Sequence, residues 1–153
     1  MKSTYKVFRE SVKHITHYYM LLVEETKSQR TVGSTNEWVL DNYYIISEQE
    51  KVMREELKGL EHGAWKIERK RLKLIGDLLR GYLERCHWQV DKGLMFRYLT
   101  QVQVGQKDFL NYREVYGLLP LVKMELIREL GALCAALEKE GAHHYKEIGR
   151  AHV

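Results

Sequence analysis

Apolar residues recur at spacings of three, four and seven along most of this chain, and charged residues fill the positions between them. This period is typical of amphipathic helices that bury one face. The pattern predicts an all-α fold, a helical bundle of about five helices. The expected helices cover residues 5–29, 34–62, 64–86, 92–103 and 115–140.

Two of these helices begin at a sequence pattern typical of a capping box. Ser34 stands three residues before Glu37, and Asn111 stands three residues before Glu114. In such a box each side chain satisfies a backbone N–H of the other residue. Pro120 lies inside the last helix and removes one backbone hydrogen bond, so we expect this helix to be kinked or to restart there.

The helix over residues 34–62 carries Trp38, Ile45 and Val52 at seven-residue steps. This spacing predicts a seam buried against a neighbouring helix. Asp41 and Asn42 interrupt the apolar run, and an unpaired buried carboxylate is costly. We therefore expect both side chains to hydrogen-bond to a neighbouring helix end or loop and to fix the register of the bundle.

Composition and charge add a few limits. The formal net charge of +4 is a mild excess in a charge-rich chain and does not by itself indicate nucleic-acid binding. The N-terminus lacks a signal-peptide core, and no apolar run approaches the ~18 residues of a membrane span. We expect a soluble fragment on the cytoplasmic side. Cys86 and Cys134 are too far apart for a metal motif, so we interpret them as buried or free thiols.

The chemistry that these residues suggest is sparse. The sequence has no glycine-rich phosphate loop, no nucleophile elbow and no His-Glu-x-x-His motif. Glu37 and Asp41 lie one helical turn apart and could share acid–base work, but we interpret them as a cap and a surface hydrogen-bonding residue. We predict no catalytic, metal-binding or cofactor-binding residue in this chain.

A basic cluster opens the helix expected at 64–86. Clustered cations neutralise phosphates, which makes this the best nucleic-acid candidate in the chain. We favour a solvated helix face, and a nucleic-acid partner is not expected. The alternative is an independent binding module that contacts nucleic acid or an acidic protein through residues 66–73. The cations of the cluster are Lys66, Arg69, Lys70, Arg71 and Lys73.

The last residues, 147–153, are what the codons GAG-ATC-GGA-AGA-GCA-CAC-GTC encode. This string is similar to a common sequencing-adapter sequence. We therefore expect residues 1–146 to form a helical N-terminal domain, a fragment of a longer protein, and residues 147–153 to be an artefactual tail.

Two blocks of this sequence resemble the N-terminal region of cyclic β-1,2-glucan synthases, which are large bacterial membrane proteins. Residues 37–49 are similar to the family's E-W-L-L-D-N-(aromatic)-x-(aliphatic)-(aliphatic)-x-E-Q segment, and residues 110–120 to its L-T-x-G-E-L-W-A-L-P segment. The chain departs from the family pattern at Arg113, at Tyr116 and in its more basic stretch 65–71. We interpret it as a diverged branch. The matching positions are Glu37, Trp38, Asp41, Asn42, Glu114 and Pro120.

The resemblance implies a parent protein that transfers glucose from UDP-glucose to a β-glucan in the bacterial cytoplasmic membrane and trims the chain with a glycoside-phosphorylase-like domain. Neither catalytic domain would lie in this chain. The resemblance therefore implies a non-catalytic scaffold, and the expected partners are the parent's transferase and membrane domains, with glucan as a further candidate. It gives the six matching residues no role.

Overall fold

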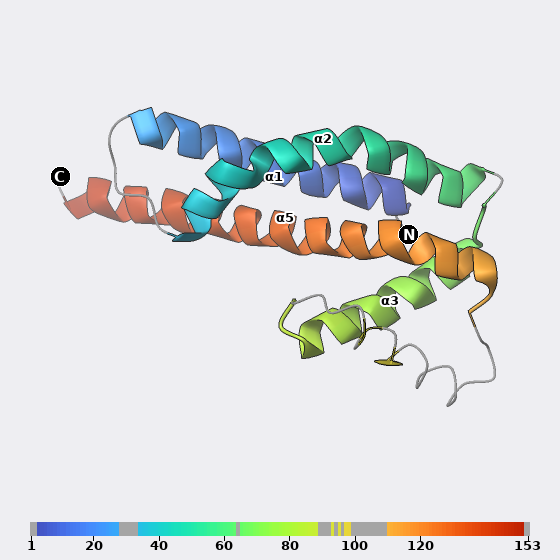
Figure 1. Ribbon diagram of the computed structural model, residues 1–153. Coiled ribbons are helices and arrows are strands. Elements are labelled where there is room, and N and C mark those ends of the chain that lie inside the picture. The colour runs from blue at the N-terminus through green and yellow to red at the C-terminus, as the bar shows by residue number, and fades with distance from the viewer. Residues whose placement is uncertain are drawn as a thin grey trace. The chain divides into compact units, whose positions relative to one another are not determined.

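The computed structural model describes residues 3–27, 34–63, 65–88, 93, 95, 97–98 and 110–151. Four helices and no strand are found in this part of the chain (Figure 1): α1 (Thr4–Lys27), α2 (Ser34–His62), α3 (Arg69–Arg85) and α5 (Tyr112–Ala151). The all-α prediction is confirmed, but the number of helices is four, not about five. Most of the helix expected at 92–103 lies outside the described residues.

The helix boundaries follow the sequence pattern closely, except at α3 and α5. α3 begins at Arg69, not at residue 64, because Lys66 and Ile67 bond back to the end of α2. The Ile67 N–H donates to the Leu60 carbonyl at 2.8 Å, and the Lys66 N–H to the Gly63 carbonyl at 3.1 Å. α5 is one helix with Pro120 inside it, so the helix does not restart there. The kink at Pro120 stays a prediction, as does the domain boundary at 146.

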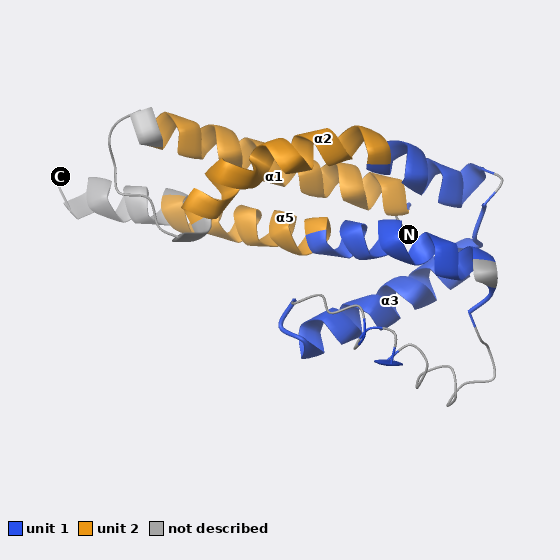
Figure 2. Cartoon of the chain, viewed as in Figure 1, with its two compact units in different colours: residues 1, 3, 53–126 blue, residues 2, 4–52, 127–153 orange. Residues whose placement is uncertain are grey.

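The chain divides into two compact units, and α2 and α5 contribute to both (Figure 2). Unit 1 comprises residues 1, 3 and 53–126, and unit 2 comprises residues 2, 4–52 and 127–153. In unit 1 the end of α2, all of α3 and the start of α5 share a core. Its buried side chains are Met53, Leu57, Leu60, Ile67, Leu72, Ile75, Leu79, Tyr82, Leu83, Leu121, Val122 and Met124.

In unit 2, α1 packs against the first part of α2 and the later part of α5. Polar and aromatic contacts join α1 to α2 in this unit. The Tyr18 hydroxyl donates to Asn36 Oδ1 at 2.6 Å, and the Tyr19 and Tyr43 rings stack with centroids 4.0 Å apart. α1 approaches α5 closely at Gly131, where an added Cβ would lie 3.0 Å from the Ser11 backbone. The buried cluster consists of Ile15, Tyr18, Leu22, Val39, Ile46 and Cys134.

The predicted seam on α2 is wrong by one residue. Trp38, Ile45 and Val52 are 51%, 43% and 46% exposed, whereas their C-terminal neighbours Val39, Ile46 and Met53 are buried. Since one residue turns a helix by about 100°, this shift moves the predicted stripe out of the core. The buried stripe keeps the seven-residue spacing, so the period was right and its phase was not.

Candidate functional site

The start of α5 is fixed by a reciprocal cap. Asn111 Oδ1 accepts from the Glu114 N–H at 2.9 Å, and the Asn111 N–H donates to Glu114 Oε1 at 2.9 Å. This geometry confirms the capping box predicted at residues 111 and 114, with asparagine in the position usually taken by serine or threonine. The contact places the Glu114 carboxylate at the first turn of α5.

Glu114 also forms a largely buried ion pair with Arg71. Arg71 Nε donates to Glu114 Oε2 at 2.7 Å, and a second guanidinium nitrogen donates to Oε1 at 2.9 Å. Glu114 is only 1% exposed, so the parallel pair of bonds lies largely out of water. Hydrogen bonds from Arg71 hold the pKa of Glu114 below its usual value, although burial acts in the opposite direction. The carboxylate is therefore held ionised, which makes it a poor proton donor.

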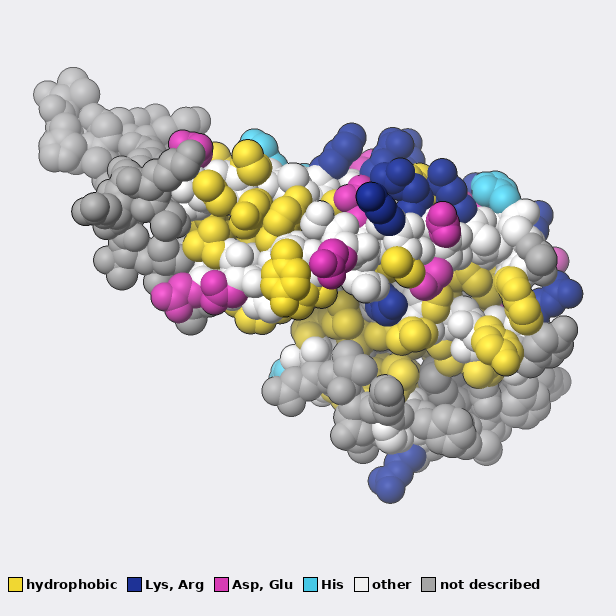
Figure 3. Space-filling model, turned by 45° about the horizontal axis from the view of Figure 1, so that its top comes forward, with side chains coloured by type: hydrophobic (Ala, Val, Ile, Leu, Met, Phe, Trp, Pro, Cys, Tyr) yellow, Lys and Arg dark blue, Asp and Glu magenta, His cyan; other side chains and the backbone are white. Residues whose placement is uncertain are grey.

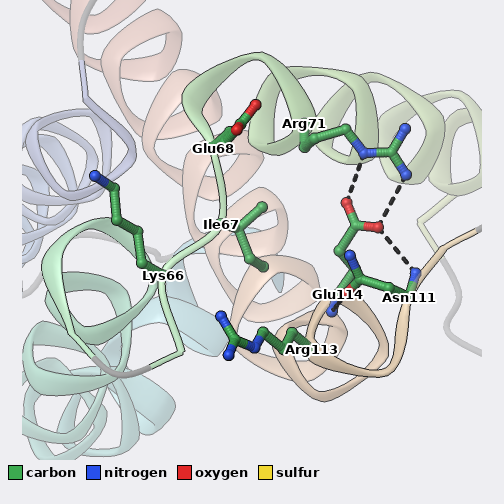
Figure 4. A pocket seen from close by; sticks show the side chains of 7 residues that line it. All are labelled: Lys66, Ile67, Glu68, Arg71, Asn111, Arg113 and Glu114. Atoms are coloured by element: carbon green, nitrogen blue, oxygen red, sulfur yellow. Dashed lines mark hydrogen bonds and ion pairs between the residues drawn. The ribbon is translucent and has the colours of Figure 1, made fainter.

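A cavity of about 400 Å³ opens beside this pair in unit 1 (Figure 4). In Figure 4 the Arg71, Glu114 and Asn111 side chains face one another on one side, while the Lys66 side chain extends away from them. Lys66 and Arg113 are exposed, and neither has an ion-pair partner among the described residues. The cavity is lined by Lys66, Ile67, Glu68, Arg71, Asn111, Arg113 and Glu114.

A second ion pair joins the same two helices. Arg80 donates to Glu125 at 3.2 and 3.3 Å and to Asp77 at 3.4 Å, and Glu125 is 1% exposed. Arg71 pairs with Glu114, and Arg80, later on α3, pairs with Glu125, later on α5. The two helix segments therefore run in the same direction. The sequence reasoning missed both pairs. Residues 43 and 45 positions apart carry no local pattern that would link them.

The residues on which the expected resemblance to cyclic β-1,2-glucan synthases depends fall into two groups in different units. Glu114 and Pro120 belong to unit 1, where Glu114 is buried and Pro120 is half-buried. Glu37, Trp38 and Asp41 lie exposed on α2 in unit 2.

The expectation for the polar pair on α2 is wrong. The Asn42 amide donates to the Trp38 carbonyl of its own helix at 2.8 Å, and Asp41 is exposed. Side-chain bonds to the backbone four residues earlier are a local alternative for such residues. The two residues therefore do not fix the register of the bundle through a neighbouring helix or loop in the described structure.

The described residues carry neither a metal cluster nor a membrane-spanning helix. The described residues contain no group of three His, Cys, Asp or Glu side chains that could hold a metal ion. Over the described ranges, no helix has a stretch apolar and long enough to cross a membrane. Both cysteines are free; burial raises the pKa of the Cys134 thiol to about 11.

Comparison with known proteins returned no match. No protein-family model matches this chain, and neither a curated protein nor a solved structure is similar enough to match it.

Proposed function

We propose that this chain is a non-catalytic helical scaffold, the N-terminal region of a cyclic β-1,2-glucan synthase-like protein. The parent would transfer glucose from UDP-glucose to a β-glucan and trim the product by phosphorolysis. The support for the family is the resemblance of residues 37–49 and 110–120. The support for a scaffold role comes from the contacts of the motif residues themselves.

The state of Glu114 is the single observation that carries the scaffold role. Among the six family-matching residues, Glu114 is the buried acid and the obvious candidate for acid–base chemistry. Both of its oxygens accept bonds from Arg71, and Oε1 also accepts from the Asn111 N–H. A general acid or base must reach the proton of a substrate and titrate near the working pH. A carboxylate held ionised by a guanidinium and a cap instead joins α3 to α5.

UDP-glucose turnover tests this proposal directly. The purified chain, supplied with UDP-glucose and β-glucan oligosaccharides, should release neither UDP nor a longer glucan, and it should release no glucose 1-phosphate when inorganic phosphate is added. Turnover that disappears in a Glu114→Gln variant would overturn the scaffold role. Extending the reading frame in clean genomic DNA tests the family. A stop codon soon after Lys146 would refute the parent, and a downstream transferase domain would support it.

The basic cluster supports a second candidate, a module that contacts nucleic acid or an acidic protein. Arg69, Lys70 and Lys73 are exposed on α3, as binding to nucleic acid or to an acidic protein requires. The pairing of Arg71 with Glu114 takes one cation out of the cluster. The test is therefore a Lys70→Gln/Lys73→Gln variant. Salt-sensitive DNA binding by the wild type that falls at least tenfold in this variant would favour the second candidate.

A further inference from the structure

The predicted seam on α2 is an apolar surface that the described residues of its own unit leave about half exposed. We define the α2 stripe as Trp38, Ile45 and Val52, which are close to half exposed and are spaced by seven residues. A seven-residue step turns an α-helix by only about −20°, so the three side chains form a nearly straight row. The row extends over fourteen residues (52 − 38), or about 21 Å, which is the length of roughly four helical turns.

One edge of the α2 stripe is acidic. Glu37, Asp41 and Glu48 are exposed, and none has a hydrogen-bond or ion-pair partner among the described residues. Asp41 and Glu48 repeat the seven-residue step, about 60° around the helix from Trp38 and Ile45. Residues 34–52, which carry the α2 stripe, contain four carboxylates and one cation, Lys51, although the whole chain has a net charge of +4. Figure 3 shows hydrophobic and acidic side chains beside one another on one face of the molecule.

We propose that the α2 stripe is a docking surface for a cationic amphipathic helix of a partner polypeptide. Apolar side chains of such a helix would cover Trp38, Ile45 and Val52, and its flanking Lys or Arg residues would pair with Asp41 and Glu48. The seven-residue spacing matches the seam of two helices that pack at a shallow angle. Charge complementarity also sets the approach and the register of the partner.

The charge of the surface argues against three other occupants. Anionic lipid surfaces and nucleic acid would be repelled by the exposed carboxylates. A second copy of this chain would bring two acidic rows to one interface, where like charges are costly. The inference deepens the proposed scaffold function by naming the chemistry of the partner, and it rests on that function.

A designed peptide serves as the probe. We would use a 21-residue helix with Leu at the a and d positions of each heptad and Lys at the e and g positions. The control peptide carries Glu in place of Lys. Calorimetry with the intact chain should show binding of the Lys peptide and at least tenfold weaker binding of the Glu peptide. The affinity for the Lys peptide should fall as the salt concentration rises.

Matched variants locate the contact on the protein. Ile45→Ser should weaken binding of the Lys peptide at least tenfold. Met20→Ser should leave it unchanged. Met20 is a matched control because it is an apolar side chain that is 55% exposed on α1. α1 contacts α2 through the stacked Tyr19 and Tyr43 rings, and Tyr43 lies about 140° around α2 from Trp38.

A second pair of variants tests the charge. Glu48→Gln and Ser47→Lys each raise the net charge by one. Only Glu48 borders the α2 stripe, because Ser47 is exposed about 180° from Trp38. Glu48→Gln should weaken binding about threefold and Ser47→Lys by less. Circular dichroism of each variant checks that the helices are intact.

Four outcomes would overturn the docking proposal. They are no binding of the Lys peptide, equal binding of both peptides, an Ile45→Ser affinity equal to wild type, and a dimer in sedimentation that Ile45→Ser dissociates. The last outcome would assign the stripe to a second copy. None of these outcomes touches the scaffold function, which fails only on UDP-glucose turnover or on the reading frame.

Discussion

The contact between Arg71 and Glu114 predicts a specific pattern in a double-mutant cycle. Glu114→Gln keeps an oxygen that can accept the Asn111 N–H, so it preserves the cap. It removes the charge and puts an NH2 group in place of the second oxygen that accepts from Arg71. Arg71→Met keeps an unbranched side chain as far as the position of Nε and removes the rest of the guanidinium. The double variant replaces the ion pair by an amide beside a thioether. The cycle therefore measures the free energy of the pair apart from that of the cap.

The expected magnitudes follow from the unequal burial of the two partners. Removing one partner of a fully buried ion pair costs about 3–5 kcal/mol. The Arg71 side chain is 24% exposed, so water can still reach it in Glu114→Gln, and we expect a loss of about 2 kcal/mol. Arg71→Met leaves a 1% exposed carboxylate that keeps the hydrogen bond from the Asn111 N–H, and we expect a loss of about 3 kcal/mol. The double variant should also lose about 3 kcal/mol, which gives a coupling of about 2 kcal/mol.

Urea unfolding followed by circular dichroism measures these differences. The midpoints should shift while the denaturant slopes stay constant, since the surface exposed on unfolding hardly changes. The reasoning would be refuted if Arg71→Met were within about 0.5 kcal/mol of the wild type, the range usual for an exposed surface residue. Additive single losses would equally refute it, because the contact at 2.7 Å would then carry no coupling.

Three further predictions concern acid stability, helix contacts and thiol reactivity. The pKa of Glu114 is lowered from 4.5 in the folded chain, so the ionised carboxylate stabilises the fold fully above about pH 4.5. This stabilisation is lost as the pH falls through the lowered pKa of the folded state. Between pH 5 and pH 3 the wild type should therefore lose more free energy of unfolding than Glu114→Gln. Gly131→Ala should lower the free energy of unfolding by about 1–3 kcal/mol, because its Cβ meets the Ser11 backbone. Gly141→Ala, with nothing within 4 Å, should raise it by up to about 1 kcal/mol, so thermal unfolding should show a lower midpoint for the first variant only. At pH 8, Cys134 should react with a thiol reagent at least a hundredfold more slowly than the half-buried Cys86, because Cys134 is buried and has a pKa of about 11. Mass spectrometry of the labelled chain distinguishes the two sites.

Local physical signals in the sequence predicted the helices and one part of the site. Hydrophobic period and glycine breaks placed α1 and α2 to within a few residues, and the capping pattern at Asn111 and Glu114 was right in both hydrogen bonds. Both signals act between residues at most four positions apart. They are written directly into the sequence.

The rest of the site depends on contacts between distant residues. Arg71 is one of five cations within eight positions (66–73), and no rule of spacing distinguishes it from Lys70. Arg71 pairs with Glu114 because it lies on the side of α3 that faces α5. That side is determined only by the packing of the helices in the unit. The same holds for Arg80 and Glu125, which lie 45 positions apart and are linked by no rule of spacing. Sequence reasoning therefore predicted the cap and missed the guanidinium that completes it.

The error on α2 has a different physical origin. Val39, Ile46, Met53 and Leu60 form one seven-residue series, and Trp38, Ile45 and Val52 form another beside it. Either series could serve as the buried face, since both have the right period. The structure buries the first series, and Val39 and Ile46 join the core of unit 2 there. A helix with two apolar stripes can bury one stripe against a neighbouring helix of its own unit and still leave the second stripe partly exposed. The wrong phase of the prediction and the proposed docking surface thus have one cause: α2 carries more apolar surface than its own unit covers.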